Sequence, residues 1–329
     1  MKSFLSVILT VLFPVFFACN NSGGYQPVSI IFDTDIGPDY DDVGALTLLH
    51  ALADSGEAKI LATVSSNIYD YTASCIDVIN TYYHRPGIPI GAPKVGVHLI
   101  DGHLEKWAEF LPANFSHSIE PGQSVADAVQ VYRRILASEP DTSVVIVTVG
   151  FLTNLAGLLE SPPDNYSPLN GKLLVEQKVK HLVSMAGVFP NGREFNVYCD
   201  STASVKAFSE WPTPIIFSGG EIGGNILTGK RLIASNITNT PAKETYTICM
   251  RQGDFDGRPS WDQTAVLVAV RGCEPYFNTV KGQITVHEDG SNTWVNNPSG
   301  KHEYLTWKMP IDKLTRIIED LMMHEPLIK

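Results

Sequence analysis

The sequence is poor in basic residues for its length. Its 329 residues include 24 Lys and Arg against 35 Asp and Glu, which gives a formal net charge of −11. Binding to a nucleic-acid backbone requires a basic surface that displaces counterions, so we expect no nucleic-acid partner. The composition is otherwise that of an ordinary globular protein, with 44% hydrophobic and 18% charged residues.

The sequence also has few cysteines, and it lacks internal repeats and a CxxC pair. Apart from Cys19, the cysteines are Cys75, Cys199, Cys249 and Cys273. Because these four are far apart and are not clustered with histidines, the spacing argues against a structural zinc site. We expect them to be buried free thiols.

The apolar run over residues 4–17 is too short to span a membrane and is typical of a signal-peptide core. It follows the basic residue Lys2 and leads to Ala18-Cys19, which looks like a bacterial lipobox. We therefore expect residues 1–19 to be a signal peptide, residues 20–27 a flexible tether and residues 28–329 a single domain. The protein would be exported to the periplasmic face and held at the membrane only by a lipid on Cys19. Ordinary signal cleavage is the alternative.

The remaining chain alternates short apolar runs with helical patterns. We expect strands at residues 28–32, 59–64, 143–149, 179–186, 214–217 and 284–286. We expect helices at residues 43–53, 72–83, from Thr153 onward, 266–270 and 311–323. Continuous apolar strands separated by helices indicate an α/β fold, with a doubly wound, largely parallel central sheet and helices on both faces. Sites in such sheets lie at the carboxyl ends of the strands.

Five aspartates follow the first expected strand directly: Asp33, Asp35, Asp39, Asp41 and Asp42. Carboxylates at this density repel one another unless a cation lies among them. Oxygen ligands favour a hard divalent cation, Ca²⁺ or Mg²⁺. The alternative is a solvated acidic turn in which one of the last two aspartates caps the next helix. An EF-hand does not fit, because its loop requires glycine and glutamate at positions that this segment does not supply.

Five separated motifs resemble those of inosine-uridine-preferring nucleoside hydrolases. The first is Asp33-Thr34-Asp35 with the Asp41-Asp42 pair. The others are the segments 63–67 (TVSSN), 149–154 (VGFLTN), 185–187 (MAG) followed by 194–196 (EFN), and 261–262 (WD). They occur in the family's order and cover nearly the whole mature chain. The resemblance implies a nucleoside hydrolase-like, Rossmann-like domain that cleaves the N-glycosidic bond of ribonucleosides, releasing ribose and a free base.

The resemblance also implies a calcium site. Its ligands would be the side chains of Asp35, Asp42 and Asp262, together with the backbone carbonyl of Val149. Asp35 would in addition be the base that takes a proton from the attacking water. Cleavage of the bond passes through a positively charged, oxocarbenium-like sugar, which suits a site rich in carboxylates.

The same resemblance assigns several residues to the binding of the small-molecule substrate. Asp41 would contact a ribose hydroxyl, and Asn67, Glu194 and Asn196 would hydrogen-bond the sugar. Met185 would line the pocket. The sequence leaves a homodimer and a homotetramer both open.

The chain departs from the family in two places. Asp41-Asp42 lies two residues further from Asp35 than the corresponding pair in the best-known members, so Asp39 is an extra carboxylate. Trp261 stands where many members have a histidine that protonates the leaving base. Indole has no useful proton to donate, but it can stack on a purine. The resemblance therefore assigns Trp261 to the leaving-group contact and implies a preference for purine nucleosides. A core tryptophan near the pocket wall is the alternative.

A Pro/Gly-rich segment over residues 93–112 is a candidate lid, with His98, His103 and Trp107 as its candidate contacts to the substrate.

Other classes of protein also fit parts of the sequence. A phosphatase of the haloacid dehalogenase type would place its nucleophile loop at residues 33–35, but the later motifs suit a diol better than a phosphate. A non-catalytic nucleoside- or sugar-binding lipoprotein and a hydrolase of another ribosyl glycoside both remain open.

Overall fold

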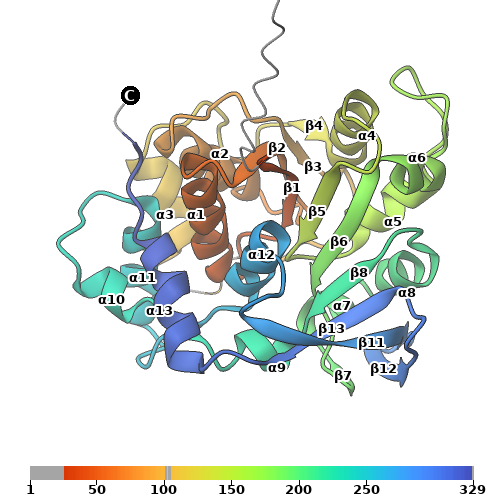
Figure 1. The fold of residues 1–329 in the computed structure, drawn as a ribbon. Helices are drawn as coiled ribbons and strands as arrows, with labels where there is room; N and C mark the ends of the chain where they lie inside the picture. The colour runs from red at the N-terminus through yellow and green to blue at the C-terminus, as the bar shows by residue number, and fades with distance from the viewer. Residues whose placement is uncertain (1–25, 101, 103–104, 328–329) are drawn as a thin grey trace, which may run out of the picture.

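A central sheet of eleven strands organises the structure, a computed structural model that describes residues 26–327 apart from residues 101, 103 and 104. The strands run in the order β4-β3-β2-β1-β5-β6-β8-β13-β11-β12-β7 (Figure 1). Their bounds are β1 Val28–Thr34, β2 Ala58–Ser65, β3 Ile90–Ala92, β4 Ala126–Asp127, β5 Val144–Thr148, β6 Val179–Met185, β7 Asn191–Arg193, β8 Ile215–Ser218, β11 Phe277–Val286, β12 Ser291–Asn296 and β13 His302–Trp307. A separate two-stranded ribbon pairs β9 (Leu227–Thr228) with β10 (Arg258–Pro259).

Helices connect the strands and cover the sheet. Their bounds are α1 Asp41–Asp54, α2 Thr72–Tyr82, α3 Trp107–Asn114, α4 Ala128–Ser138, α5 Thr153–Glu160, α6 Gly171–Lys178, α7 Phe195–Cys199, α8 Ser201–Glu210, α9 Gly220–Gly223, α10 Lys230–Ala234, α11 Pro241–Met250, α12 Trp261–Arg271 and α13 Ile311–Met322. In the part of the chain that is described, no helix combines the length and hydrophobicity needed to cross a bilayer.

Alternate residues of the central strands supply two hydrophobic cores. Ile30 and Phe32 of β1 belong to one core, which also contains residues of α1, α2, α11, α12 and α13. Ile31 points to the other core, with residues of α4, α5, α6 and α8. Figure 1 shows these two helix layers on opposite faces of the sheet. Because both faces are covered, the strands are apolar on both sides, as the sequence pattern predicts.

The strands from β4 to β13 pair in parallel, and β11, β12 and β7 continue the sheet with antiparallel pairs. The predicted α/β fold with a largely parallel sheet is therefore confirmed. Each strand expected from the sequence overlaps an observed strand, and the helix expected at residues 266–270 is part of α12. Among the described residues, Cys75, Cys199, Cys249 and Cys273 form no disulfide; Cys75 and Cys249 are buried as expected, whereas Cys199 and Cys273 are half-buried.

The chain order places a topological switch beside β1. From β1 the chain builds the sheet outward through β2, β3 and β4, and it then returns to pair β5 with the other edge of β1. Crevices that bind ligands form at such switch points, outside the carboxyl ends of the strands. The loop after β1 and the loop after β5 both open into this crevice.

Candidate active site

A cavity of about 520 Å³ lies at the carboxyl ends of β1, β5 and β6. It brings together segments from many parts of the chain. Its lining residues are Asp35, Pro38, Asp39, Asp41, Asp42, Val149, Met185, Val188, Arg193, Glu194, Phe195, Asn196, Gly220, Arg258, Trp261 and Asp262. Of the residues that the sequence assigns to the site, all except Asn67 are in this set.

Two helix starts carry the acidic side chains into the cavity. Asp41 and Asp42 are the first two residues of α1, and Asp262 is the second residue of α12. Negative charge at a helix N-terminus is favoured by the free backbone N–H groups and the helix dipole. Carboxylate oxygens of these three residues all lie within 4.8 Å of one another.

Close packing of α1 against α12 makes this convergence possible. A Cβ atom at Gly44 of α1 would lie 2.5 Å from Nε2 of Gln263 and 2.6 Å from Oη of Tyr246. These distances are well inside van der Waals contact, so a side chain at this position would displace the ends of the Gln263 and Tyr246 side chains that pack against α1. Asp42 and Asp262 therefore meet although they are far apart in the sequence.

The acidic cluster fits a cation. Asp35 and Asp42 are buried, with exposed fractions of 2% and 0%. Within the described structure, Oδ2 of each carboxylate has no hydrogen-bond partner. Oδ1 of Asp42 accepts a hydrogen bond from Oγ1 of Thr34. Because buried charged groups need a partner, these unpaired oxygens could serve as ligands of a metal ion.

The electrostatics of the carboxylates support the same conclusion. Burial raises the pKa of Asp35 well above its usual value, and the neighbouring Asp42 raises it further. Burial likewise raises the pKa of Asp42 and of Asp262, with Asp41 adding to both shifts. A positive ion among these groups would favour their charged forms and reverse the shifts.

The loop after β5 approaches Asp35 through Gly150. A Cβ atom on Gly150 would lie 2.4 Å from the backbone nitrogen of Asp35 and 2.5 Å from Oγ of Ser66. The neighbouring Val149 lines the cavity, and its carbonyl oxygen accepts a hydrogen bond from Nδ2 of Asn196 at 2.9 Å. Asn196 thus lies beside the carbonyl to which the resemblance assigns a metal-binding role.

Glu194 is held by backbone groups on the opposite wall of the cavity. Its carboxylate accepts hydrogen bonds from the backbone N–H groups of Asn196 at 2.8 Å, Val197 at 3.2 Å and Gly187 at 3.3 Å. Burial raises the pKa of Glu194 to about 7, although these hydrogen bonds lower it. Met185 is buried beside it, with Sδ 3.4 Å from Nδ2 of Asn196. These contacts fix the shape of the wall where the sugar is expected.

Asn67 lies behind the site and not in its wall. Its Nδ2 donates to the carbonyl oxygens of Asp35 at 3.1 Å and Leu99 at 2.8 Å. Its Oδ1 accepts from the backbone N–H groups of Tyr69 and Leu99, both at 3.1 Å. The side chain that the sequence assigns to the sugar therefore anchors the backbone of the Asp35 loop in this structure.

Asp33 also stabilises the loop after β1. Its carboxylate accepts hydrogen bonds from Oη of Tyr132 at 2.8 Å and from Nδ2 of Asn154, and it does not line the cavity. Through these contacts Asp33 orients the loop after β1. Asn154 is the second residue of α5, and it joins this loop to β2 through the carbonyl of Ser65 at 2.8 Å.

Trp261 begins α12 and is half-buried in the cavity wall. Its Nε1 donates a hydrogen bond to the carbonyl oxygen of Gly220 at 2.8 Å. This bond fixes the ring and uses the one N–H group that indole has. The indole therefore presents its ring, and not a proton donor, to the cavity.

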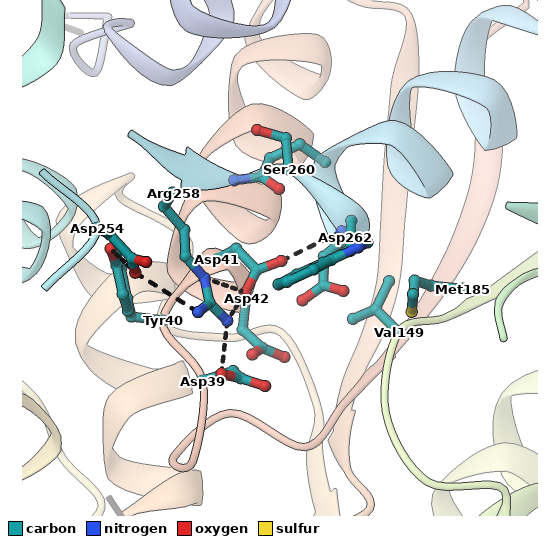
Figure 2. Close-up of polar contacts among 12 residues, drawn as sticks. Asp39, Tyr40, Asp41, Asp42, Val149, Met185, Asp254, Arg258, Ser260 and Asp262 are labelled. Carbon is teal, nitrogen blue, oxygen red and sulfur yellow. Dashed lines mark hydrogen bonds and ion pairs between the residues drawn. The ribbon is translucent and has the colours of Figure 1, made fainter. Parts of the chain in front are cut away.

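Arg258 is the main site residue that the sequence analysis does not identify. It lies on β10, is buried and lines the cavity. Its Nη2 donates to Oδ1 of Asp39 at 2.5 Å and to Oδ1 of Asp41 at 2.7 Å (Figure 2). The extra carboxylate of the longer loop thus pairs with this guanidinium. Its position three residues before the Trp-Asp motif is the one signal that could have suggested it.

The candidate lid at residues 93–112 is not a single unit. Trp107 is fully buried in the hydrophobic core at the start of α3. His98 is exposed, with its ring centroid 6.2 Å from that of Tyr69. His103 lies outside the described residues. Core packing of Trp107 is incompatible with the expected swing into the site, because its removal would leave a large void.

Residues 30–309 match the family described as inosine-uridine preferring nucleoside hydrolase. The match covers most of the chain, so this chain belongs to that family, and it is an N-glycosyl hydrolase that acts on small-molecule nucleosides. Members of the family depend on a metal, and the buried aspartates described above supply a site that could bind one. No curated protein matches the sequence.

Solved structures of nucleoside hydrolases share the fold. A plant nucleoside hydrolase superposes with a TM-score of 0.65 at 19% identity, covering 90% of this chain and 99% of that one. An inosine-guanosine nucleoside hydrolase gives 0.64 at 21%, covering 89% and 98%. An inosine-uridine preferring nucleoside hydrolase from Bacillus anthracis gives 0.66 at 16%, covering 90% and 99%. At these identities the likeness shows the fold alone.

Proposed function

We propose that this chain hydrolyses ribonucleosides in a Ca²⁺-dependent reaction that favours purine nucleosides. The observation that carries the proposal is a cavity lined by buried carboxylates, in which Oδ2 of Asp35 and Oδ2 of Asp42 have no partner among the described residues. Charges of this kind persist in a folded protein only when a cation or a hydrogen-bonding ligand compensates them.

The residues that would hold Ca²⁺ are Asp35, Asp42 and Asp262, with the carbonyl of Val149. Ca²⁺ bound there would supply positive charge that attracts the ribose hydroxyls and makes a water molecule more acidic. Asp42 and Asp262 are buried at the starts of two helices and Asp35 is buried directly after β1, so the fold already holds these side chains around one cavity. Such preorganisation favours both binding and catalysis.

The protein groups then have distinct roles in bond cleavage. The bond between C1′ of ribose and the base nitrogen breaks, and its electron pair leaves with the base, which takes up a proton from solvent to become the free base. The water oxygen forms a new bond to C1′, and the Asp35 carboxylate accepts the proton that the water loses. The negative charge of the surrounding carboxylates stabilises the positive charge that develops on the sugar.

The walls of the cavity account for substrate choice in this proposal. Asp41 accepts a hydrogen bond from a ribose hydroxyl, while Glu194, Asn196 and Met185 shape the wall against the sugar. Trp261 stacks on the leaving base. A two-ring purine offers more surface for stacking than a pyrimidine, and such aromatic pairs add roughly 0.5–1.5 kcal/mol beyond area burial.

A substrate panel tests the proposed activity. Purified protein is incubated with inosine, guanosine, adenosine, uridine and cytidine, and free ribose is measured as reducing sugar. We expect ribose from the purine nucleosides first. Binding of the same nucleosides without release of ribose would contradict the proposal and would indicate a binding protein.

We further propose that residues 28–329 act as one domain that is exported and anchored by a lipid on Cys19. The support is the sequence pattern of the leader, since Cys19 lies outside the described residues. Membrane and soluble fractions of cells expressing the protein or its Cys19→Ser variant test this. A mature soluble form of the unaltered protein would contradict the anchor.

A further inference from the structure

Arg258 places a buried positive charge inside an acidic site. Its exposed fraction is 9%. The guanidinium donates to one oxygen of Asp41 twice, from Nε at 3.0 Å and from Nη2 at 2.7 Å. Paired hydrogen bonds between a guanidinium and a carboxylate fix the relative orientation of the two groups. The pair joins β10 to the first residue of α1, which are far apart in the sequence.

The loop between Asp35 and Asp41 is built around this arginine. Asp39 pairs with Nη2 at 2.5 Å, and the Tyr40 ring centroid lies 4.7 Å from Cζ of Arg258. Oη of Tyr40 donates to Oδ2 of Asp254 at 2.7 Å, and that oxygen is 3.7 Å from Nη1 of the arginine. Figure 2 shows Asp39, Asp41 and Asp254 around the guanidinium. Three carboxylates and a ring therefore hold the arginine in one position.

The pairing of Arg258 with Asp41 gives Asp41 and Asp42 different roles. Oδ1 of Asp41 is occupied by Arg258, and the positive charge beside it lowers the attraction of this carboxylate for a second cation. Oδ2 of Asp42 has no partner in the described structure. Asp41 is thus the carboxylate in the close acidic cluster least suited to hold a metal, and it is well suited to accept a hydrogen bond in a fixed direction.

We propose that Arg258 is a positioning residue that holds Asp41 as the acceptor for a ribose hydroxyl, and that it thereby sets selectivity for ribosides over 2′-deoxyribosides. The inference rests on the proposed function, because it takes a riboside as the ligand of the cavity. A site built around a hydroxyl discriminates against the deoxy analogue by ~10⁴. That discrimination requires the acceptor to be fixed, which is what Arg258 provides.

The Arg258→Met substitution should affect two measured quantities differently. Selectivity, measured as kcat/KM for inosine divided by that for 2′-deoxyinosine, falls at least tenfold because Asp41 is released. Affinity for Ca²⁺, measured by calorimetry, stays the same or increases because a positive charge beside the acidic cluster is gone. A residue that only stabilised the fold would lower metal binding and leave the selectivity unchanged.

Three further variants make the comparison specific. Arg271→Met removes an arginine from the other end of α12, where it pairs with Glu57 at 2.7 Å, and it should change neither quantity. In an Asp41→Asn background, Arg258→Met should have no additional effect on selectivity, because the arginine acts through that carboxylate. If Arg258→Met does not fold, Arg258→Lys retains the charge without the paired geometry, and its selectivity should still fall.

Binding measurements separate this inference from the proposed hydrolysis. 1,4-Anhydro-D-ribitol and its 2-deoxy analogue have no base to cleave, so their dissociation constants with Ca²⁺-loaded protein do not depend on turnover. We expect the unaltered protein to prefer the first compound and Arg258→Met to lose most of that preference. Equal preference in both proteins, or a loss of rate confined to substrates with poor leaving groups, would overturn the inference. Absence of nucleoside hydrolysis with the binding preference intact would instead refute the proposed reaction alone.

Discussion

The indole Nε1 of Trp261 donates a hydrogen bond to the carbonyl oxygen of Gly220 at 2.8 Å. The donor of the side chain is therefore used within the protein, and the ring is fixed between α9 and the acidic cluster. Cζ of Arg258 lies 5.0 Å from the ring centroid, a distance typical of a cation–π contact. Leaving-group assistance by Trp261 must come from its ring surface.

We predict that Trp261→Ala lowers kcat/KM more for inosine and guanosine than for uridine. Stacking contributes roughly 0.5–1.5 kcal/mol beyond area burial, so the purine reactions should slow by at least about tenfold once buried area is included. A nitrophenyl riboside, whose leaving group needs no activation, should be affected least. Steady-state kinetics with the three substrate types measures the difference.

Trp261→Phe is the matched control, because it retains a ring and loses the hydrogen bond to Gly220. It should keep most of the preference for purines. An equal loss of rate with all substrates in Trp261→Ala would mean that the residue only supports the start of α12.

The position of Asn67 leads to a second prediction. Asn67→Ala removes four hydrogen bonds that tie the Asp35 loop to Leu99 and Tyr69. Unsatisfied buried groups cost about 1–3 kcal/mol, so unfolding in urea should occur at lower concentration. We also expect kcat and Ca²⁺ affinity to fall together, since the loop that carries Asp35 loses its anchor.

This outcome differs from that of a direct sugar contact, for which KM would rise while Ca²⁺ affinity stayed constant. Asn170→Ala is the control for stability, because Asn170 caps α6 through the backbone N–H of Leu173, away from the cavity. It should cost a similar free energy, about 1 kcal/mol, without a change in activity.

A third prediction concerns pH and the buried imidazole of His50. Burial lowers the pKa of His50 to about 3, although the hydrogen bond to Asn80 raises it. The unfolded chain takes up a proton near pH 6.5, whereas the folded chain does not. His50 therefore stabilises the fold above pH 6.5, and this contribution is lost progressively as the pH falls toward 3, at about 1.4 kcal/mol per pH unit.

His50→Gln should lower the free energy of unfolding at pH 7.5, and the difference from the unaltered protein should shrink by about 2 kcal/mol at pH 5. Urea titrations at the two pH values measure this change. The exposed His287, replaced by Gln in the same way, should give parallel curves. Parallel curves for His50→Gln would show that the imidazole titrates normally.

Much of the fold follows from local patterns in the sequence. The run at residues 143–149 and the Asp-rich segment after residues 28–32 are strongly patterned, so β5, β1 and the start of α1 could be predicted with the correct order. Strands that are buried on both faces need apolar residues at every position, so they appear in the sequence as continuous apolar runs. The antiparallel end of the sheet is harder to predict because the pairing of β11, β12 and β7 depends on distant segments.

In the site, too, the residues that are hard to predict are those whose role depends on contacts between distant segments. Asp35, Asp42 and Asp262 belong to recognisable motifs, whereas Arg258 lies in a short ribbon without a pattern of its own. Its role depends on contact with Asp39 and Asp41, and long-range pairing of this kind leaves no periodic signal in one sequence. Asn67 is the opposite case: it belongs to a recognisable motif, but the motif does not show that its amide points to the Asp35 loop and away from the cavity.

Calcium dependence tests the account most directly. Protein freed of metal by a chelator is titrated with Ca²⁺, and release of ribose from inosine is measured alongside calorimetric binding, with the Asp42→Ala variant in parallel. We predict that activity returns in proportion to one bound Ca²⁺ and that Asp42→Ala loses about 10³-fold in metal affinity, as expected when a buried charge loses its partner. Full activity of the metal-free protein, or of Asp42→Ala without bound metal, would contradict the account.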